Sequence, residues 1–187
     1  MQRPRPIPQN TDPFVFGDYF LYTFCRQTPR AKQLHMLRPG SVIVFGSVLH
    51  YRFVCDTVFV VEQAVSHTSS DWASVLEGLV PEEFVITTLE PMYAWRPPSD
   101  RHYTLYVGAR PSTSIDGMFS FVPCRRAEAG RFDRPAVDDI PGLSPRNARA
   151  VSFNNSIAPN EVEDRWRHLA ESVLGQGLAL GTHIELP

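Results

Sequence analysis

The stretch Leu37–Val61, LRPGSVIVFGSVLHYRFVCDTVFVV, constrains the fold of this chain more than any other part of it. It contains two apolar runs, Ser41–Phe45 and Phe53–Val61, that are rich in the β-branched and aromatic residues typical of strands. The polar segment His50–Arg52 joins the two runs, and the turn-forming pair Pro39-Gly40 precedes them. The stretch therefore predicts two neighbouring core strands.

Asp56 stands in the middle of the second apolar run. A carboxylate in such a place is costly unless it is paired or well hydrogen-bonded. Asp56 is therefore either a base or nucleophile of a small enzyme acting on a nucleotide or sugar-like substrate, or a core carboxylate satisfied by backbone donors or by an arginine such as Arg52. No P-loop, Rossmann glycine motif, HExxH or GxSxG accompanies it.

Length and composition bound the alternatives. The 187 residues suffice for a single globular α+β domain over 14–187, preceded by an arm, residues 1–13, with four prolines. A formal charge of -2 argues against a protein that coats nucleic acid through an overall positive field. The basic residues other than Lys32 are arginines, which suit phosphate and carboxylate groups but also follow from a GC-rich genome.

The same composition bears on location and cofactors. The chain has no apolar run long enough to span a membrane and no apolar core of a secretory signal at its N-terminus, so we expect a cytoplasmic protein without a membrane partner. Its three cysteines lack the spacing of metal ligands, so we expect reduced thiols, no metal site and no cofactor. The sequence does not indicate an oligomeric state.

Outside the central stretch, alternation predicts a first core strand over 18–24, with Phe20, Tyr22 and Phe24 on one face. A short helix is expected over about 29–37, and another after the capping residues 69–71. The clearest helix is Pro159–Leu174, whose apolar residues recur at helical spacing. A final strand is expected after it.

Two further segments carry candidate ligand-binding residues. Residues 102–108 and 118–123 alternate as strands and predict a hairpin, joined by a polar loop that contains Arg110 and Asp116 and followed directly by Arg125 and Arg126. Its arginines form either an anion site or a solvated strand end. Trp95, in a proline-rich loop, either contacts a ligand or covers an edge of the core.

The run from Leu21 through Cys25-Arg26 and the Pro-Gly turn to Phe45-Gly46-Ser47 resembles PUA-like domains of the EVE, ASCH and nucleotide-modification-associated type, over residues 18–61. The resemblance implies a small curved mixed sheet or PUA-like barrel, flanked by short helices and one long C-terminal helix. Ser41 stands where aspartate is common in those domains, and the C-terminal half shows no counterpart.

Several PUA-like domains bind a modified or flipped nucleobase, so the resemblance implies nucleic-acid or nucleotide recognition in an aromatic-lined pocket. A non-catalytic interaction domain of a mobile-element or defence system is the alternative from another class. The residues with the chemistry for base stacking, base-edge contacts and phosphate contacts are Tyr22, Cys25, Arg26, Phe45, Ser47, Tyr51, Asp56, Trp95, Arg110, Asp116 and Arg125.

Overall fold

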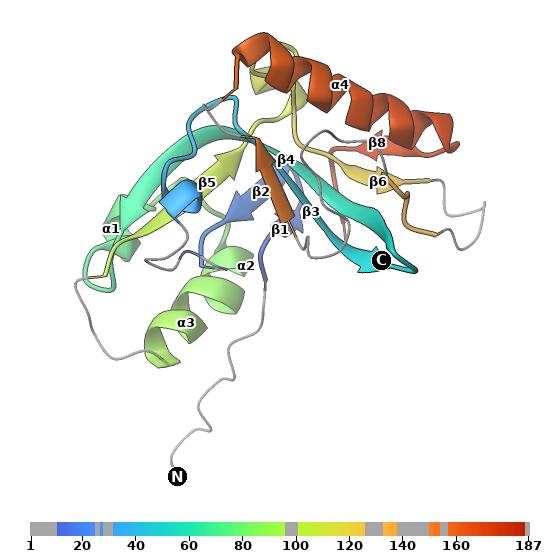
Figure 1. Cartoon of the computed structure of the whole chain (residues 1–187). Coiled ribbons are helices and arrows are strands. Elements are labelled where there is room, and N and C mark those ends of the chain that lie inside the picture. The colour runs from blue at the N-terminus through green and yellow to red at the C-terminus, as the bar shows by residue number, and fades with distance from the viewer. Residues whose placement is uncertain are drawn as a thin grey trace.

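The computed structural model describes residues 11–24, 27, 32–95, 101–125, 133–137, 150–153 and 157–185. Its α+β fold is built on an antiparallel sheet of six strands in the order β1-β2-β5-β4-β3-β7, beside the two-stranded sheet β6-β8 (Figure 1). The elements are β1 (Phe14–Phe16), β2 (Tyr19–Tyr22), η1 (Lys32–His35), β3 (Val42–Leu49), β4 (Arg52–His67), α1 (Trp72–Val75), α2 (Glu82–Phe84), η2 (Val85–Leu89), α3 (Glu90–Trp95), β5 (Tyr103–Gly108), η3 (Pro111–Thr113), β6 (Val122–Cys124), β7 (Ala150–Phe153), α4 (Pro159–Gly175) and β8 (Ala179–Gly181).

The two predicted central strands are confirmed as the antiparallel pair β3 and β4, both longer than expected. β4 is the longest strand and joins the two halves of the sheet. Its first part pairs with β3 and its last part with β5, and the pairing skips Asp56 in the first part and Glu62 in the second. Each skipped residue is the extra residue of a β-bulge, which bends and twists the strand that carries it.

The first bulge decides which side chains of β4 face the same core. Cys55 before it and Val58 after it both pack in the cluster beneath α4, although residues at this spacing lie on opposite faces of a regular strand. The extra residue, Asp56, shifts the alternation of inward and outward side chains by one position along β4. Gly46 lies opposite it, and a Cβ there would come within 2.1 Å of the Val54 carbonyl oxygen. The close approach of the two strands therefore requires glycine.

Three hydrophobic clusters follow the curvature of the sheet. The central cluster collects side chains from both halves, including Phe20 and Tyr106 on one side and Ile43 and Phe59 on the other. A second cluster lies between β3, β4 and α4, and a third lies between β2, β5 and the helices α1 to α3. The sheet therefore curves around the central cluster, with helices on its outer surface at both ends (Figure 1). The described strands do not close into the barrel that the PUA-like resemblance implies, and the pairs that they form are antiparallel, so the sheet is not mixed.

The long C-terminal helix is confirmed as α4. Val162, Leu169 and Val173 are buried as predicted, whereas Trp166 is half-buried and donates its indole Nε1–H to the Phe119 carbonyl at 3.0 Å. At the other end, α2, η2 and α3 form one continuous helical stretch whose middle is a π-helix. Pro91 begins the next turn without an N–H, which explains why regular α-helical bonding is interrupted there.

Several local predictions are wrong. The first strand, expected over 18–24, is the shorter β2, and β1 before it was not predicted. Phe24 lies past the end of β2, so it packs away from Phe20 and Tyr22. The expected helix at 29–37 is the short turn η1, and residues 28–31 lie outside the described residues. The helix after Asp71 is only α1, which ends before Gly78 at a φ of 73°.

The predicted hairpin of residues 102–108 and 118–123 does not form. β5 already has β2 on one edge and β4 on the other, so no edge is left for a third strand. Phe121 instead pairs with Val58, farther along the same edge of β4, and β6 then pairs with β8. Only part of the expected arm is described: Thr11 bonds to Thr88 in η2 at 2.7 Å, and the Asp12 carboxylate accepts from the backbone N–H groups of Thr23 and Phe24.

Candidate functional site

The residues predicted to bind a ligand do not form one pocket. Tyr22 and Phe45 meet edge to face with ring centroids 5.5 Å apart, but both are buried in the central cluster. Trp95 is 55 % exposed at the end of α3, Arg110 is exposed and starts η3, and Asp116 lies in the turn between Ile115 and Met118. Cys25 and Arg26 lie outside the described residues. The predicted aromatic-lined pocket is therefore absent from the described part of the chain.

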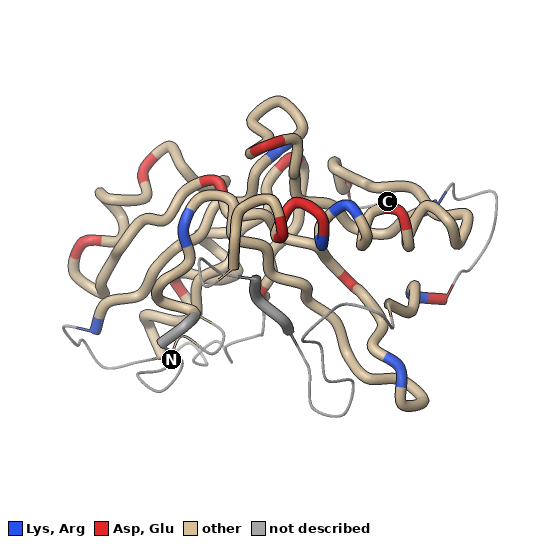
Figure 2. Tube along the Cα trace, turned by 45° about the horizontal axis from the view of Figure 1, so that its top comes forward, with Lys and Arg blue, Asp and Glu red and all other residues tan. Residues whose placement is uncertain are grey.

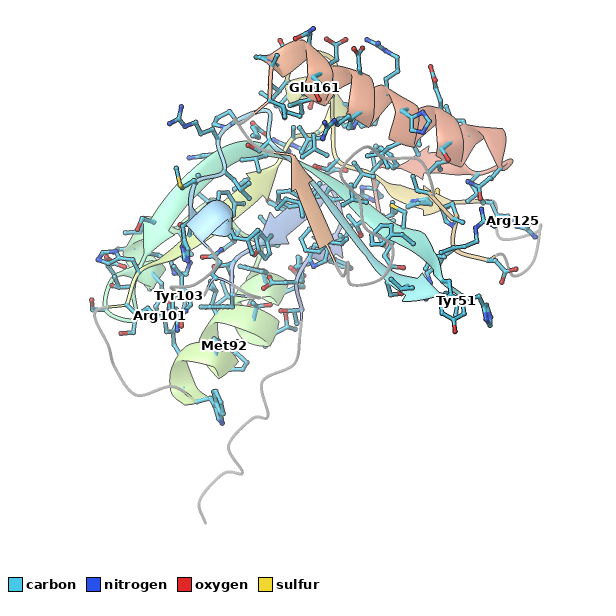
Figure 3. All side chains as sticks on the ribbon, viewed as in Figure 1. Tyr51, Met92, Arg101, Tyr103, Arg125 and Glu161 are labelled. Atoms are coloured by element: carbon cyan, nitrogen blue, oxygen red, sulfur yellow. The ribbon has the colours of Figure 1, made fainter. Side chains whose placement is uncertain are left out.

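Four of the predicted residues do lie at one end of the molecule, on or near the hairpin of β3 and β4. Ser47 and Tyr51 belong to the hairpin, and Asp56 is the bulge residue of β4. Arg125, which follows β6, lies at the same end as Tyr51 (Figure 3). This end of the molecule, with four of the eleven predicted residues, is the candidate site.

We call residues 48–52 the hairpin tip. The two residues of its turn, His50 and Tyr51, have left-handed backbones with φ of 49° and 66°. This is the conformation that tight hairpin turns require, and it is normally supplied by Asn-Gly because a Cβ makes it costly. Tyr51 is 91 % exposed, and Val48 and Leu49 beside it are 38 % and 45 % exposed. The tip therefore presents an apolar surface in which the ring of Tyr51 is the most exposed side chain.

Basic residues lie at the same end of the molecule as this ring. Arg52 and His50 are exposed on either side of it in the chain, and Arg125 is exposed at the end of β6. Arg134 is anchored at the same end because its guanidinium donates to both oxygens of the Asp56 carboxylate, at 2.8 and 3.1 Å. The side chains of Asp56 and Arg134 are 40 % and 44 % exposed, so this ion pair is a surface contact.

Asp56 is thus not buried. Its partner is Arg134, which the sequence could not indicate because the two residues are far apart in the chain. One nitrogen of Arg134, Nη1, contacts both oxygens, which leaves Asp56 as a satisfied carboxylate, the structural alternative to a catalytic role, with a different arginine from Arg52. The buried thiol next to it, Cys55, has its pKa raised to about 12 by burial and by the charge of Asp56, so it is not a nucleophile at neutral pH.

At the opposite end of the molecule, three polar side chains form a hydrogen-bonded series that the sequence analysis did not predict. His67 is fully buried, its Nε2 lies 2.9 Å from the Thr23 hydroxyl and its Nδ1 lies 2.7 Å from the Tyr93 hydroxyl. Burial lowers the pKa of His67 to about 4, so the ring is neutral at pH 7. Its only sequence signal is a histidine at the end of a long apolar strand, which is too common to single out.

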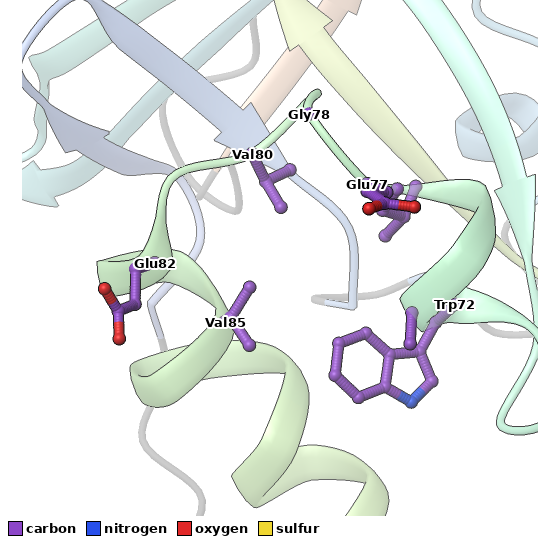
Figure 4. Close-up of a pocket in the computed structure, with 8 residues that line it drawn as sticks. Trp72, Glu77, Gly78, Val80, Glu82 and Val85 are labelled. Carbon is purple, nitrogen blue, oxygen red and sulfur yellow. The ribbon is translucent and has the colours of Figure 1, made fainter.

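The Tyr93 ring in turn stacks on Trp72, with centroids 6.0 Å apart and ring planes 16° from parallel. Trp72 lines a cavity of about 280 Å³ beside α1, shown in Figure 4. The hydrogen-bonded chain from Thr23 to Tyr93 therefore holds one wall of a pocket.

Within the described residues, no group of three or more His, Cys, Asp or Glu side chains could hold a metal ion. No helix in that part of the chain is long and apolar enough to cross a membrane. Comparisons of the chain with protein-family models, with curated proteins and with solved structures found no significant match.

Proposed function

We propose that this protein recognises single-stranded nucleic acid, stacking an unpaired base on Tyr51 at the hairpin tip. The observation that carries the proposal is the 91 % exposure of Tyr51 on a left-handed backbone. In this conformation a tyrosine costs about 1–2 kcal/mol, and an exposed ring recovers little of that cost through packing. A base has a flat face that can stack on such a ring whatever its sequence.

The surrounding charges support the same proposal. Arg52 and Arg125 are exposed at this end of the molecule and can contact phosphates on either side of a stacked base. The PUA-like resemblance of residues 18–61 also favours nucleobase recognition. The proposal moves the base from an enclosed pocket to an exposed ring, because Tyr22 and Phe45 are buried against each other.

The test replaces Tyr51 with phenylalanine and with glycine and measures the binding of a labelled single-stranded oligonucleotide by fluorescence anisotropy. Tyr51→Phe keeps the stacking face and is expected to bind as the wild type does. Tyr51→Gly is expected to lose about 1–3 kcal/mol, or about 5- to 150-fold in affinity. It should also raise the stability by about 1 kcal/mol, because glycine adopts the left-handed backbone freely.

This combination separates the loss of a contact from the loss of the fold. A Tyr51→Gly variant that melts higher than the wild type and binds the oligonucleotide equally well would exclude the proposal. Arg52→Gln and Arg125→Gln should each lower the dependence of log affinity on log salt concentration by about 0.7 if each contacts one phosphate. Arg167→Gln on α4 is the matched charge control and should leave this dependence unchanged.

The interaction-domain alternative rests on the same surface, since Val48, Leu49 and Tyr51 form an exposed apolar patch. In that case the wild type would not bind oligonucleotides at any salt concentration. The enzyme alternative needs Asp56 as base or nucleophile, and the ion pair of Asp56 with Arg134 favours a structural role for this carboxylate instead.

A further inference from the structure

The cavity beside Trp72 lies between α1 and the start of the helical stretch of α2 and η2 (Figure 4). Trp72, Val80 and Val85 line its walls, and Glu77 and Glu82 stand on opposite sides of it. At about 280 Å³ it matches the small end of the range of ligand pockets, which begins at about 300 Å³. Its size suits one side chain of a polypeptide.

The aromatic wall of this cavity is held in place. Tyr93 stacks on the Trp72 ring and is itself fixed by its hydrogen bond to the buried His67. His67 is fixed on its other side by Thr23 of the strand region. A wall supported in this way presents the indole ring in one orientation and loses little freedom when a ligand binds.

The two charged residues that line the cavity, Glu77 and Glu82, are both acidic. Between residues 71 and 95, all of which are described, the chain has five acidic residues, Asp71, Glu77, Glu82, Glu83 and Glu90, and no lysine or arginine. Arg101, at the same end of the molecule, stacks on the Tyr103 ring. In Figure 2 the end of the molecule that carries α1 to α3 is marked mainly by Asp and Glu. Glu77 and Glu82 are exposed, and neither forms an ion pair with another described residue.

These features select a class of ligand. Unpaired carboxylates on two sides of a cavity repel phosphates and carboxylates and raise the local concentration of cations. An indole ring attracts a guanidinium or ammonium group over its face, and it does so more strongly than a phenol or phenyl ring. The planar guanidinium of arginine can stack on such a ring and donate to a carboxylate at its edge.

We propose that the cavity beside Trp72 binds an arginine side chain of a partner polypeptide. The guanidinium lies against the indole ring between Glu77 and Glu82, and the aliphatic part of the side chain lies along Val80 and Val85. This inference does not rest on the proposed nucleic-acid contact, because Tyr51 and the α3 residue Met92 lie at opposite ends of the molecule (Figure 3).

The experiment titrates the ¹⁵N-labelled full chain with a nine-residue Gly-Ser peptide carrying one central arginine, and follows the indole N–H signals. Its matched control is the same peptide with citrulline, which has the shape of arginine without the charge. The Trp72 signal is assigned from the Trp72→Phe variant. The Trp166 signal is an internal reference, because its indole N–H is already bonded to Phe119. We expect the arginine peptide to shift the Trp72 signal and the citrulline peptide to bind at least about tenfold more weakly.

Three single substitutions complete the test. Glu77→Gln and Glu82→Gln should each weaken binding of the arginine peptide by about three- to tenfold, whereas Glu171→Gln on α4, with the same change in net charge, should change it by less than about twofold. Equal binding of the arginine and citrulline peptides would overturn the proposal. An unchanged affinity in the Glu77→Gln/Glu82→Gln double variant would overturn it as well, as would a Trp72 signal that responds to a nucleoside and not to the arginine peptide.

Discussion

Asp56 and Tyr51 show how much the meaning of a residue depends on its local backbone. Asp56 looks buried in the sequence because its neighbours are apolar, yet as a bulge residue it turns its carboxylate to the surface and to Arg134. Tyr51 looks like an ordinary turn residue, yet it occupies a left-handed conformation and leaves its ring almost fully exposed. Hydrophobicity alone therefore predicts the wrong degree of exposure for both side chains.

The Asp56–Arg134 ion pair should contribute little to stability, because both side chains are about two-fifths exposed and solvent screens their attraction. We expect Asp56→Asn and Arg134→Gln each to lower the free energy of unfolding by less than about 1 kcal/mol, as measured by urea denaturation. The double variant should show a coupling energy of the same size. A loss of several kcal/mol in the single Asp56 variant would mean that the carboxylate is buried and the surface geometry is wrong.

At the scale of the element, β4 explains how a single strand serves two halves of the sheet. Its bulges at Asp56 and Glu62 bend the strand, and each has a glycine beside it on the partner strand. Gly46 lies opposite the first bulge, and Gly108 pairs with Val61 next to the second. A Cβ at Gly108 would come within 2.6 Å of the Cβ of Phe20. The bulges and the glycines together set the curvature of the sheet.

Replacing Gly46 with alanine tests this arrangement. A Cβ at this position would lie 2.1 Å from the Val54 carbonyl oxygen, so the two central strands must move apart. We expect Gly46→Ala to lower the free energy of unfolding by about 3 kcal/mol. The matched control is Gly175→Ala at the end of α4, where a Cβ meets nothing within 4 Å. That variant should be unchanged or up to about 1 kcal/mol more stable, since alanine favours a helix.

At the scale of the whole molecule, the curved sheet separates two surfaces of different character. The hairpin tip carries an exposed ring among arginines, whereas the helical end carries a cavity among carboxylates. The formal charge of -2 is a sum over the whole chain, so it does not reveal that basic and acidic residues gather at different ends. The two proposed sites therefore attract ligands of opposite charge, and each can be altered without touching the other.

The buried His67 makes stability depend on pH in a defined direction. Its pKa is about 4 in the folded chain against an ordinary value of 6.5, so between these values the unfolded chain binds the proton and the folded chain does not. Its contribution is therefore complete above pH 6.5 and is lost as the pH falls towards 4, by about 3 kcal/mol in total. Urea denaturation at several pH values measures this change.

His183 changes the pH dependence of stability in the opposite direction, so its contribution must be distinguished from that of His67. Hydrogen bonds that the ring donates to the carboxylates of Glu185 and Asp18 raise the pKa of this exposed histidine. Its contribution is therefore complete below pH 6.5 and is lost as the pH rises through the higher value. The difference between the wild type and His67→Gln isolates the buried group. If that difference does not change between pH 6.5 and pH 4, His67 is not the neutral buried group described above.

The sequence by itself determined the local elements whose signals are contained in a few consecutive residues. The apolar runs around Ile43 and Phe59 specify β3 and β4, and the helical spacing of Val162, Leu169 and Val173 specifies α4. These patterns survive because burial of one face is required wherever the element lies in the fold. The class of fold, α+β with a long C-terminal helix, follows from them.

Only the tertiary structure decided which of these elements meet. It placed Arg134 on Asp56, put β2 and β4 on the two edges of β5 in place of the predicted hairpin, and joined Trp72 to His67 through Tyr93. Such contacts join residues far apart in the chain, and their free energy depends on the packing of the whole molecule, so no local pattern encodes them. For the same reason, the sequence identified residues with the chemistry to bind a ligand, but it did not show whether these residues would lie together in one site.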